Sequence, residues 1–195
     1  TSGGQVLFGA RSGNENIFLH ESTMRMDWNN ASSGTINWAP FIRDQSAWYH
    51  FVLAQDTSQS TNTNRIKFYL NGVQITTLRS GVTANYPSQN LETGYNVSGQ
   101  PFFVSSYNGT AAEINAYLAD VYFVDGQQYD PTYFGKFDDN GVWVPVKPGT
   151  GEGGTISYGN NGFLLEFKQT GTGTDASGIG ADTSGNDNHL AVTNL

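Results

Sequence analysis

Two segments decide the fold: WYHFVLAQ at residues 48–55 and RIKFYLNGVQI at residues 65–75. Apolar and polar side chains alternate along the start of the second segment, so Ile66, Phe68 and Leu70 fall on one face of an extended strand. This period of two is typical of a strand with one face buried against a core. We therefore predict that both segments are strands and that a polar loop joins them.

The pair Asn71-Gly72 interrupts the second segment and predicts a tight turn. A two-residue type I′ turn needs positive φ at both central positions, which asparagine and glycine accept most readily. The alternation resumes at Val73 and Ile75, so the chain reverses direction here. The sequence thus predicts an antiparallel hairpin centred on this pair.

The composition is that of an all-β protein. The chain has 195 residues, of which 37% are hydrophobic and 13% aromatic, together with 24 glycines and no cysteine. Its length suits one β-sandwich, and it contains no long apolar segment of period 3.6. The lack of cysteine excludes disulfides and thiolate metal sites. The net charge of −8 argues against nucleic acid as a partner, and no apolar stretch is long enough to span a membrane.

Further short strands are expected along the whole chain, and Asp130-Pro131 predicts the start of one helical turn. Residues 80–100 predict a long loop at the rim of the sandwich. Beyond Phe137 the connections become rich in glycine. We expect a first domain over residues 1–137 and appended strands over 138–195 that complete or extend the sandwich and lead to a further domain. The expected strands are 6–10, 16–19, 23–28, 35–38, 102–105, 117–124, 141–145, 162–167 and the end of 181–192.

The central hairpin closely resembles that of laminin G-like, concanavalin A-like domains. An ordered series of motifs narrows the resemblance to laminin G-like segments of bacteriophage virion proteins, especially those of marine and cyanobacterial phages. The series is YLADVYFVDG (117–126), DPTYFGKF (130–137), GVWVP (141–145), NGFLLEF (161–167) and IGADTSGNDNH (179–189). The resemblance implies an antiparallel β-sandwich of jelly-roll type that binds glycans or proteins.

The same resemblance implies a non-enzymatic protein on the surface of the virion, in a tail fibre, a spike or a capsid appendage, that adheres to host-surface glycans. One alternative is a purely structural decoration or connector that binds other virion proteins. Another is a secreted cellular lectin. Because fibre proteins are commonly trimers, a homo-oligomer is also implied, although the chain has no heptad repeat.

An enzyme is not expected. Laminarinase-type hydrolases of this fold place their carboxylates as E-x-D-x-x-E on one strand, so that acid, nucleophile and helper share a face. Glu113 and Glu166 stand in no such pattern. His50 lies between two aromatic residues in the first segment, where a packed histidine is expected rather than a catalytic base.

Four residues of the expected rim loops are candidates for a glycan site: Tyr95, Asn96, Tyr107 and Asn108. Tyrosine offers a flat apolar face with a polar tip, which suits a pyranose ring, and the asparagine amides can bond sugar hydroxyls. The alternative for each tyrosine is that it covers the edge of the sandwich. The tryptophans, including Trp48 and Trp143, are expected in the core or at the ends of the sheets.

The loop around Gly185 is the candidate metal site. Asp182, Asn186, Asp187 and Asn188 offer oxygen ligands at the short spacing that Ca²⁺ prefers. The full D-x-D-x-D-G pattern is absent. The alternative is an Asx-rich turn in which these side chains bond the nearby backbone and no metal is needed.

Overall fold

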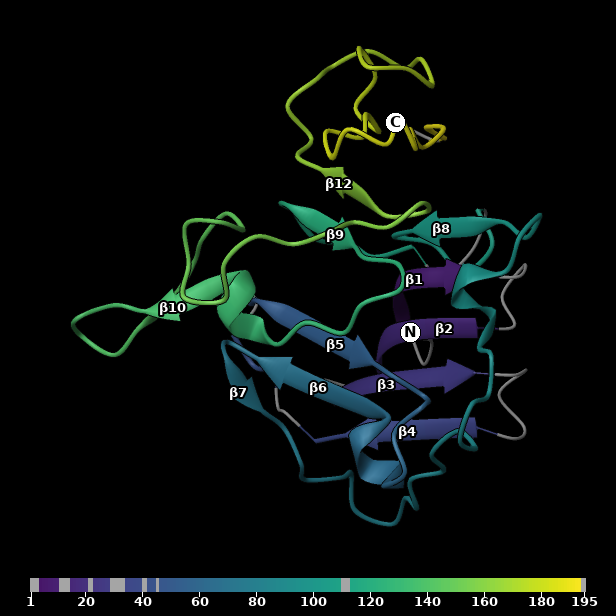
Figure 1. Ribbon diagram of the computed structural model, residues 1–195, viewed down its shortest axis with the longest axis vertical. Helices are drawn as coiled ribbons and strands as arrows, with labels where there is room; N and C mark the ends of the chain where they lie inside the picture. Colours follow the sequence, from purple (N-terminus) through teal and green to yellow (C-terminus); the bar gives the residue numbers. More distant parts are fainter. Residues whose placement is uncertain are drawn as a thin grey trace. The chain divides into compact units, whose positions relative to one another are not determined.

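The structure is a computed structural model that describes residues 4–10, 15–20, 23–28, 34–39, 42–44, 46–109 and 113–193. The described residues form an all-β protein with antiparallel sheets, as predicted, and their only helical segments are three short 3₁₀ turns (Figure 1). None of these helices is long or apolar enough to cross a membrane. The strands are β1 (Gln5–Ala10), β2 (Glu15–His20), β3 (Thr23–Trp28), β4 (Gly34–Trp38), β5 (Phe51–Gln55), β6 (Ile66–Leu70), β7 (Val73–Gln74), β8 (Phe102–Val104), β9 (Val121–Phe123), β10 (Gly135–Phe137), β11 (Trp143–Pro145) and β12 (Phe163–Leu165).

The chain forms two compact units, and each is built from two separate segments. Unit 1 comprises Thr1–Ile114 and Tyr129–Thr155, and unit 2 comprises Asn115–Gln128 and Ile156–Leu195. The expected boundary between residues 137 and 138 falls between β10 and β11. These two strands pair with each other, so both sides of that boundary belong to unit 1.

Unit 1 contains a five-stranded sheet in the order β4-β3-β2-β1-β8. Residues two apart along a strand share a face of the sheet. Met24 and Met26 of β3 and Ile36 and Trp38 of β4 therefore lie on the same face, and all four are buried, so this face belongs to the core. The edge strand β4 pairs with a loop through a single bridge from Trp38 to Leu78. The loop covers this edge, which is one way in which natural sheets avoid unwanted pairing.

The predicted hairpin forms the second sheet of unit 1, in the order β5-β6-β7. Asn71 has φ 48° and Gly72 has φ 78°, which are the positive values that a type I′ turn requires. Phe68 is buried, as its place in the alternation predicts, and its ring lies 5.4 Å from that of Trp38 in β4. The two sheets therefore pack face to face through aromatic side chains, and β5 and β6 cross β3 and β4 in Figure 1.

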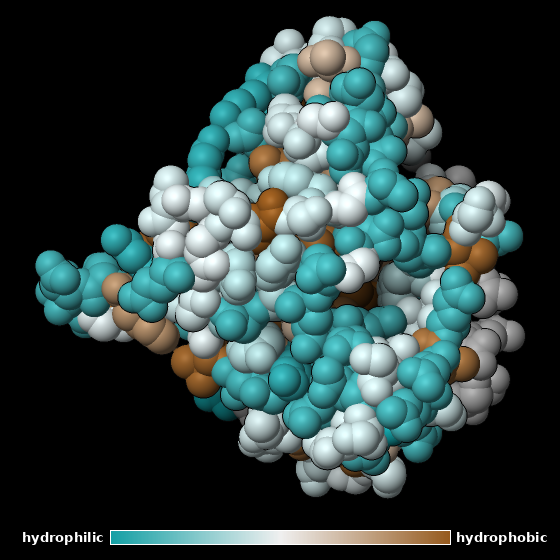
Figure 2. All heavy atoms as spheres, viewed as in Figure 1, coloured by the Kyte–Doolittle hydropathy of each residue, from teal (hydrophilic) through white to brown (hydrophobic). Residues whose placement is uncertain are grey.

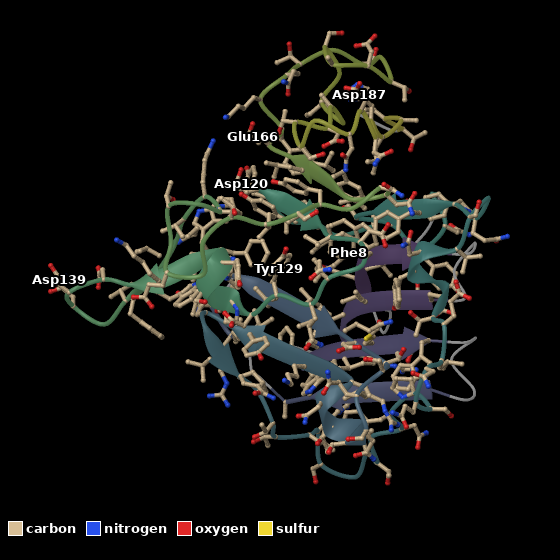
Figure 3. All side chains as sticks on the ribbon, viewed as in Figure 1. Phe8, Asp120, Tyr129, Asp139, Glu166 and Asp187 are labelled. Atoms are coloured by element: carbon tan, nitrogen blue, oxygen red, sulfur yellow. The ribbon has the colours of Figure 1, made fainter. Side chains whose placement is uncertain are left out.

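The segment after Tyr129 adds the 3₁₀ turn η4 (Pro131–Tyr133) and the β10–β11 hairpin to unit 1. The backbone N–H of Thr132 donates to the Asp130 carboxylate at 2.8 Å, so this turn has the N-cap that the sequence predicts. Asp139 lies at the tip of the hairpin (Figure 3).

Unit 2 is poor in regular structure. Its two strands, β9 and β12, pair over three residues, and the rings of Phe123 and Phe163 stack at 5.5 Å across them. The strand expected over 117–124 is shorter than predicted, because Tyr117 is exposed and Asp120 has a positive φ of 48°. The strand expected at the end of 181–192 is wrong. Residues 189–193 form no strand, and the N–H of Leu190 donates to the carbonyl of Gly180 at 2.9 Å. A single bridge joins Leu165 to Asp182 at the start of this stretch.

Candidate functional site

The turn after β8 presents Tyr107 and Asn108 on the surface of unit 1. Both side chains are exposed, Tyr107 by 38%. The backbone beneath them is held closely, because a Cβ on Gly9 of β1 would lie only 2.6 Å from the carbonyl oxygens of Ser106 and Tyr107. The N–H of Gly109 also donates to the Ser106 hydroxyl at 2.9 Å. This turn therefore offers a ring and an amide on a fixed backbone.

Tyr95 has a different environment from the one that the sequence predicts. Its hydroxyl donates to the backbone carbonyl of Asp27 at 2.7 Å. Burial, followed by the negative charges of Glu15 and Asp27, raises the pKa of Tyr95 well above its usual value. The hydroxyl is thus a protonated structural donor that fixes the rim loop to β3, and it is not presented to a ligand.

Asn96 is exposed at the end of the 3₁₀ turn η3 (Gly94–Asn96). This turn contacts β1, the strand that also supports the Tyr107 turn. The four candidate residues therefore belong to two segments that both contact β1. Of these four residues, Asn96, Tyr107 and Asn108 are exposed, whereas the Tyr95 hydroxyl is bonded to the backbone of Asp27.

Asp182, the centre of the candidate calcium loop, uses both carboxylate oxygens within the protein. Its Oδ1 accepts the backbone N–H groups of Leu164 at 2.9 Å and Ser184 at 2.8 Å. Its Oδ2 accepts the Ser184 hydroxyl and the backbone N–H of Asn188, each at 2.9 Å. Burial opposes ionisation, but these hydrogen bonds outweigh it and lower the pKa of Asp182. The carboxylate organises the loop and fixes it to β12.

The two asparagines of this loop also face the protein. The side-chain amide groups of Asn186 and Asn188 both donate to the carbonyl of Gly162 at 2.9 Å. Asp187 is exposed (Figure 3). Its Oδ1 lies 3.8 Å from Nε2 of His189. The residues described include no group of three or more histidine, cysteine or acidic side chains placed to hold a metal. These contacts are those of an Asx-rich turn, the alternative that the sequence left open.

Aspartate serves the same purpose elsewhere in both units. The carboxylates of Asp56, Asp138 and Asp175 each accept a hydrogen bond from the backbone N–H of the residue two positions later in the chain, at 2.7–3.0 Å. Hydrogen bonds to the ionised form lower the pKa of each of the three. With Asp182, four of the 17 acidic residues thus stabilise turns through these hydrogen bonds.

A second surface cluster lies around Trp143 and was not predicted as a site. The indole Nε1–H of Trp143 donates to Nδ1 of His50 at 3.0 Å. A Cβ at either Gly72 or Gly135 would overlap the Trp143 ring, so the indole fits closely between the hairpin turn and β10. Phe137 meets this ring edge to face at 5.0 Å. The residue before β5, the hairpin turn and β10 therefore converge on one indole.

The tryptophans were expected in the core or at sheet ends. Trp48 is 68% exposed just before β5, so it is not a core residue. The rings of Tyr49 and Phe51 stack at 6.3 Å, and Phe51 stacks on buried Phe68 at 6.0 Å. His50, two residues further on, is half-buried and accepts the Trp143 indole N–H.

Comparisons of the chain with models of known protein families, with curated proteins and with solved structures find no match in any of the three.

Proposed function

We propose that the chain is a non-catalytic glycan-binding module of a bacteriophage virion, with the jelly-roll topology of laminin G-like domains. It belongs to a tail fibre, a spike or a capsid appendage and adheres to host-surface glycans. The antiparallel all-β fold supports this proposal, as does the ordered series of motifs from residue 117 to residue 189.

The observation on which the proposal rests is the surface turn that contains Tyr107 and Asn108. A sugar ring stacks on an aromatic face and bonds through its hydroxyls, so it needs a ring and a polar group on the same rigid support. The close approach of the turn to Gly9 provides that support. A site fixed before binding loses little conformational entropy when the ligand binds.

A glycan array and an adsorption assay on host cells test the proposal. Tyr107→Ala should weaken glycan binding by about fivefold, because stacking on one aromatic ring contributes on the order of 1 kcal/mol. Asn108→Ala should weaken it as well. Tyr117→Ala is the matched control, because Tyr117 is an exposed tyrosine of unit 2, and it should bind as the unchanged protein does.

Two results would favour the alternatives. If no glycan binds and the protein instead associates with purified virion proteins, it is a structural decoration or connector. If the gene lies among cellular genes rather than capsid and tail genes, it encodes a secreted lectin. Retention of all glycan binding by both turn variants would contradict the site itself.

A further inference from the structure

We propose that unit 2 binds an organic ammonium ion on the parallel rings of Tyr122 and Tyr158, next to the carboxylates of Asp120 and Glu166. All four residues belong to unit 2, so the site uses no residue of the Tyr107 turn in unit 1. The inference is therefore independent of the proposed glycan adhesion, and either can be true without the other.

Two tyrosine rings provide the aromatic surface of the site. Tyr122 lies in β9 and Tyr158 lies in the segment before β12, and their rings are nearly parallel, with 7° between the planes and 6.5 Å between the centroids. Both residues are half-buried, so part of each remains accessible to solvent. The face of an aromatic ring attracts a cation through the negative charge of its π electrons. The pair of rings is thus suited to the alkyl groups and the charge of an organic ammonium ion.

The backbone beneath Tyr158 packs closely against the end of β9. The N–H of Asp125 donates to the carbonyl of Tyr158 at 2.9 Å. A Cβ on Gly162 would overlap that carbonyl, and a Cβ on Gly159 would overlap the carbonyl of Asp125. The support of this ring is therefore in place before a ligand binds, which reduces the entropic cost of binding.

Two carboxylates lie at one end of the β9–β12 pair. The register that pairs Val121 with Leu165 places Asp120 and Glu166 at this same end, as Figure 3 shows. Burial, and after it negative charge that includes both carboxylates, raises the pKa of Tyr122 well above its usual value. Both carboxylates therefore act on this ring. Like charges gathered at the end of a strand pair repel each other, so a cation is favoured here.

One ammonium group of the protein already occupies part of this negative region. Nζ of Lys168 lies 2.7 Å from Oε1 of Glu166, and Oε2 accepts the Thr183 hydroxyl at 3.1 Å. The Lys168 side chain is 61% exposed, so its ion pair is a weak surface pair that another ammonium group can replace. Lys168 is also the only lysine or arginine in unit 2, which has six acidic residues. An excess of negative charge therefore remains for a ligand.

These features favour an organic ammonium ion over other ligand classes. An inorganic cation needs several oxygen ligands, and the described residues include no group of three or more histidine, cysteine or acidic side chains placed to hold a metal. The unbalanced negative charge favours a cation over a neutral sugar and repels an anionic one. On the face drawn in Figure 2, hydrophobic residues lie in small separated groups among hydrophilic ones, unlike the larger apolar patches of protein interfaces.

NMR titrations of the whole chain test the site with pairs of probes that differ in charge. The cations are choline and glucosamine, and their neutral counterparts of similar shape are 3,3-dimethylbutan-1-ol and N-acetylglucosamine. We expect at least one cation to shift the ring signals of Tyr122 and Tyr158, and its neutral counterpart to leave them in place. The cation that binds identifies the source of the charge as a quaternary ammonium group or as the amine of a sugar. This comparison needs no variant, so it does not depend on how a variant folds.

Variants then test the role of each group. Tyr122→Leu and Tyr158→Leu should each weaken binding of the cation about threefold, because each removes one cation–ring contact. Lys168→Ala should strengthen binding about twofold, because it removes the ammonium group that competes for Glu166.

Two matched variants are the controls. Lys136→Ala removes the same charge from an exposed position in unit 1, and Tyr117→Leu removes an exposed tyrosine from unit 2. Both should bind the cation as the unchanged protein does.

Three outcomes would overturn the inference. If neither cation shifts the two tyrosine signals, unit 2 has no such site. If a neutral counterpart shifts them as strongly as its cation, the site does not recognise charge. If CaCl₂ displaces the cation far better than NaCl of equal ionic strength, the carboxylates form a site for an inorganic cation. None of these results bears on glycan binding by the Tyr107 turn.

Discussion

Gly72 is constrained in two independent ways. Its φ of 78° is unfavourable for any residue with a Cβ, and a Cβ there would also overlap the Trp143 ring. Gly81 shares only the first constraint. It has φ 77° and no atom within 4 Å of the place that a Cβ would occupy. The chain thus contains a matched pair of glycines that separates backbone strain from packing.

Gly72→Ala should therefore destabilise unit 1 more than Gly81→Ala does. A left-handed alanine costs roughly 1–2 kcal/mol, and overpacking against the indole adds roughly 1–3 kcal/mol at position 72 alone. Urea unfolding of both variants measures the difference. Equal losses of stability in the two variants would mean that the indole does not pack on this turn.

His50 provides a second prediction at the scale of one residue. Burial lowers the pKa of His50 below its usual 6.5, and its Nδ1 accepts the Trp143 bond only while unprotonated. Stability from this neutral imidazole is complete above pH 6.5, and it is lost as the pH falls through the folded pKa. The indole N–H signal of Trp143 should accordingly titrate with a midpoint below pH 6.5. A midpoint at or above that value would contradict the contact.

Among the elements, the loop from Asp182 to Asn188 illustrates how unit 2 is stabilised with few strands. Asp182→Asn replaces an oxygen that accepts hydrogen bonds with an amide group that cannot accept them, so buried donors lose their partner. The cost should be about 1–3 kcal/mol. Asp187→Asn is the control, because the Asp187 side chain is 89% exposed, and its effect should stay under about 0.5 kcal/mol.

Calcium should leave this loop unchanged. Thermal unfolding curves with millimolar Ca²⁺ and with chelator should coincide, because the Asp182 oxygens already accept four hydrogen bonds from the protein. A rise in melting temperature with Ca²⁺ that Asp182→Ala abolishes would restore the calcium interpretation of the loop.

Elements with local signals were predictable from the sequence, whereas those that depend on distant partners were not. The β6–β7 hairpin follows from alternation and one turn pair, both within ten residues. In contrast, no strand formed at the C-terminal end. There the backbone N–H of Leu190 donates to the carbonyl of Gly180, and the preceding N–H groups of Ser184 and Asn188 donate to the Asp182 carboxylate. The Tyr95 hydroxyl bonds a carbonyl 68 residues away, which no local pattern reveals. The rim loop over 80–100 formed no strand, as expected.

At the scale of the whole molecule, the aspartate turns should make folding sensitive to acid. Hydrogen bonds lower the pKa of Asp56, Asp138, Asp175 and Asp182 below the value of 3.8 typical of an unfolded chain. A depressed pKa gives stability that is complete above the unfolded value and is lost as the pH falls through the folded one. The free energy of unfolding should thus fall steadily below about pH 4. A plateau that extends to pH 2.5 would show that these turns contribute little.

The division of unit 2 into two segments has a consequence for protein synthesis. β9 leaves the ribosome about 40 residues before its partner β12, an interval of roughly 2–8 s at 5–20 residues per second. During that time the apolar side chains of β9 have no strand to pair with, while unit 1 can already complete its two larger sheets. Translation speed between residues 124 and 163 should therefore influence how much of the nascent chain aggregates, and no single cut in the chain releases unit 2 intact.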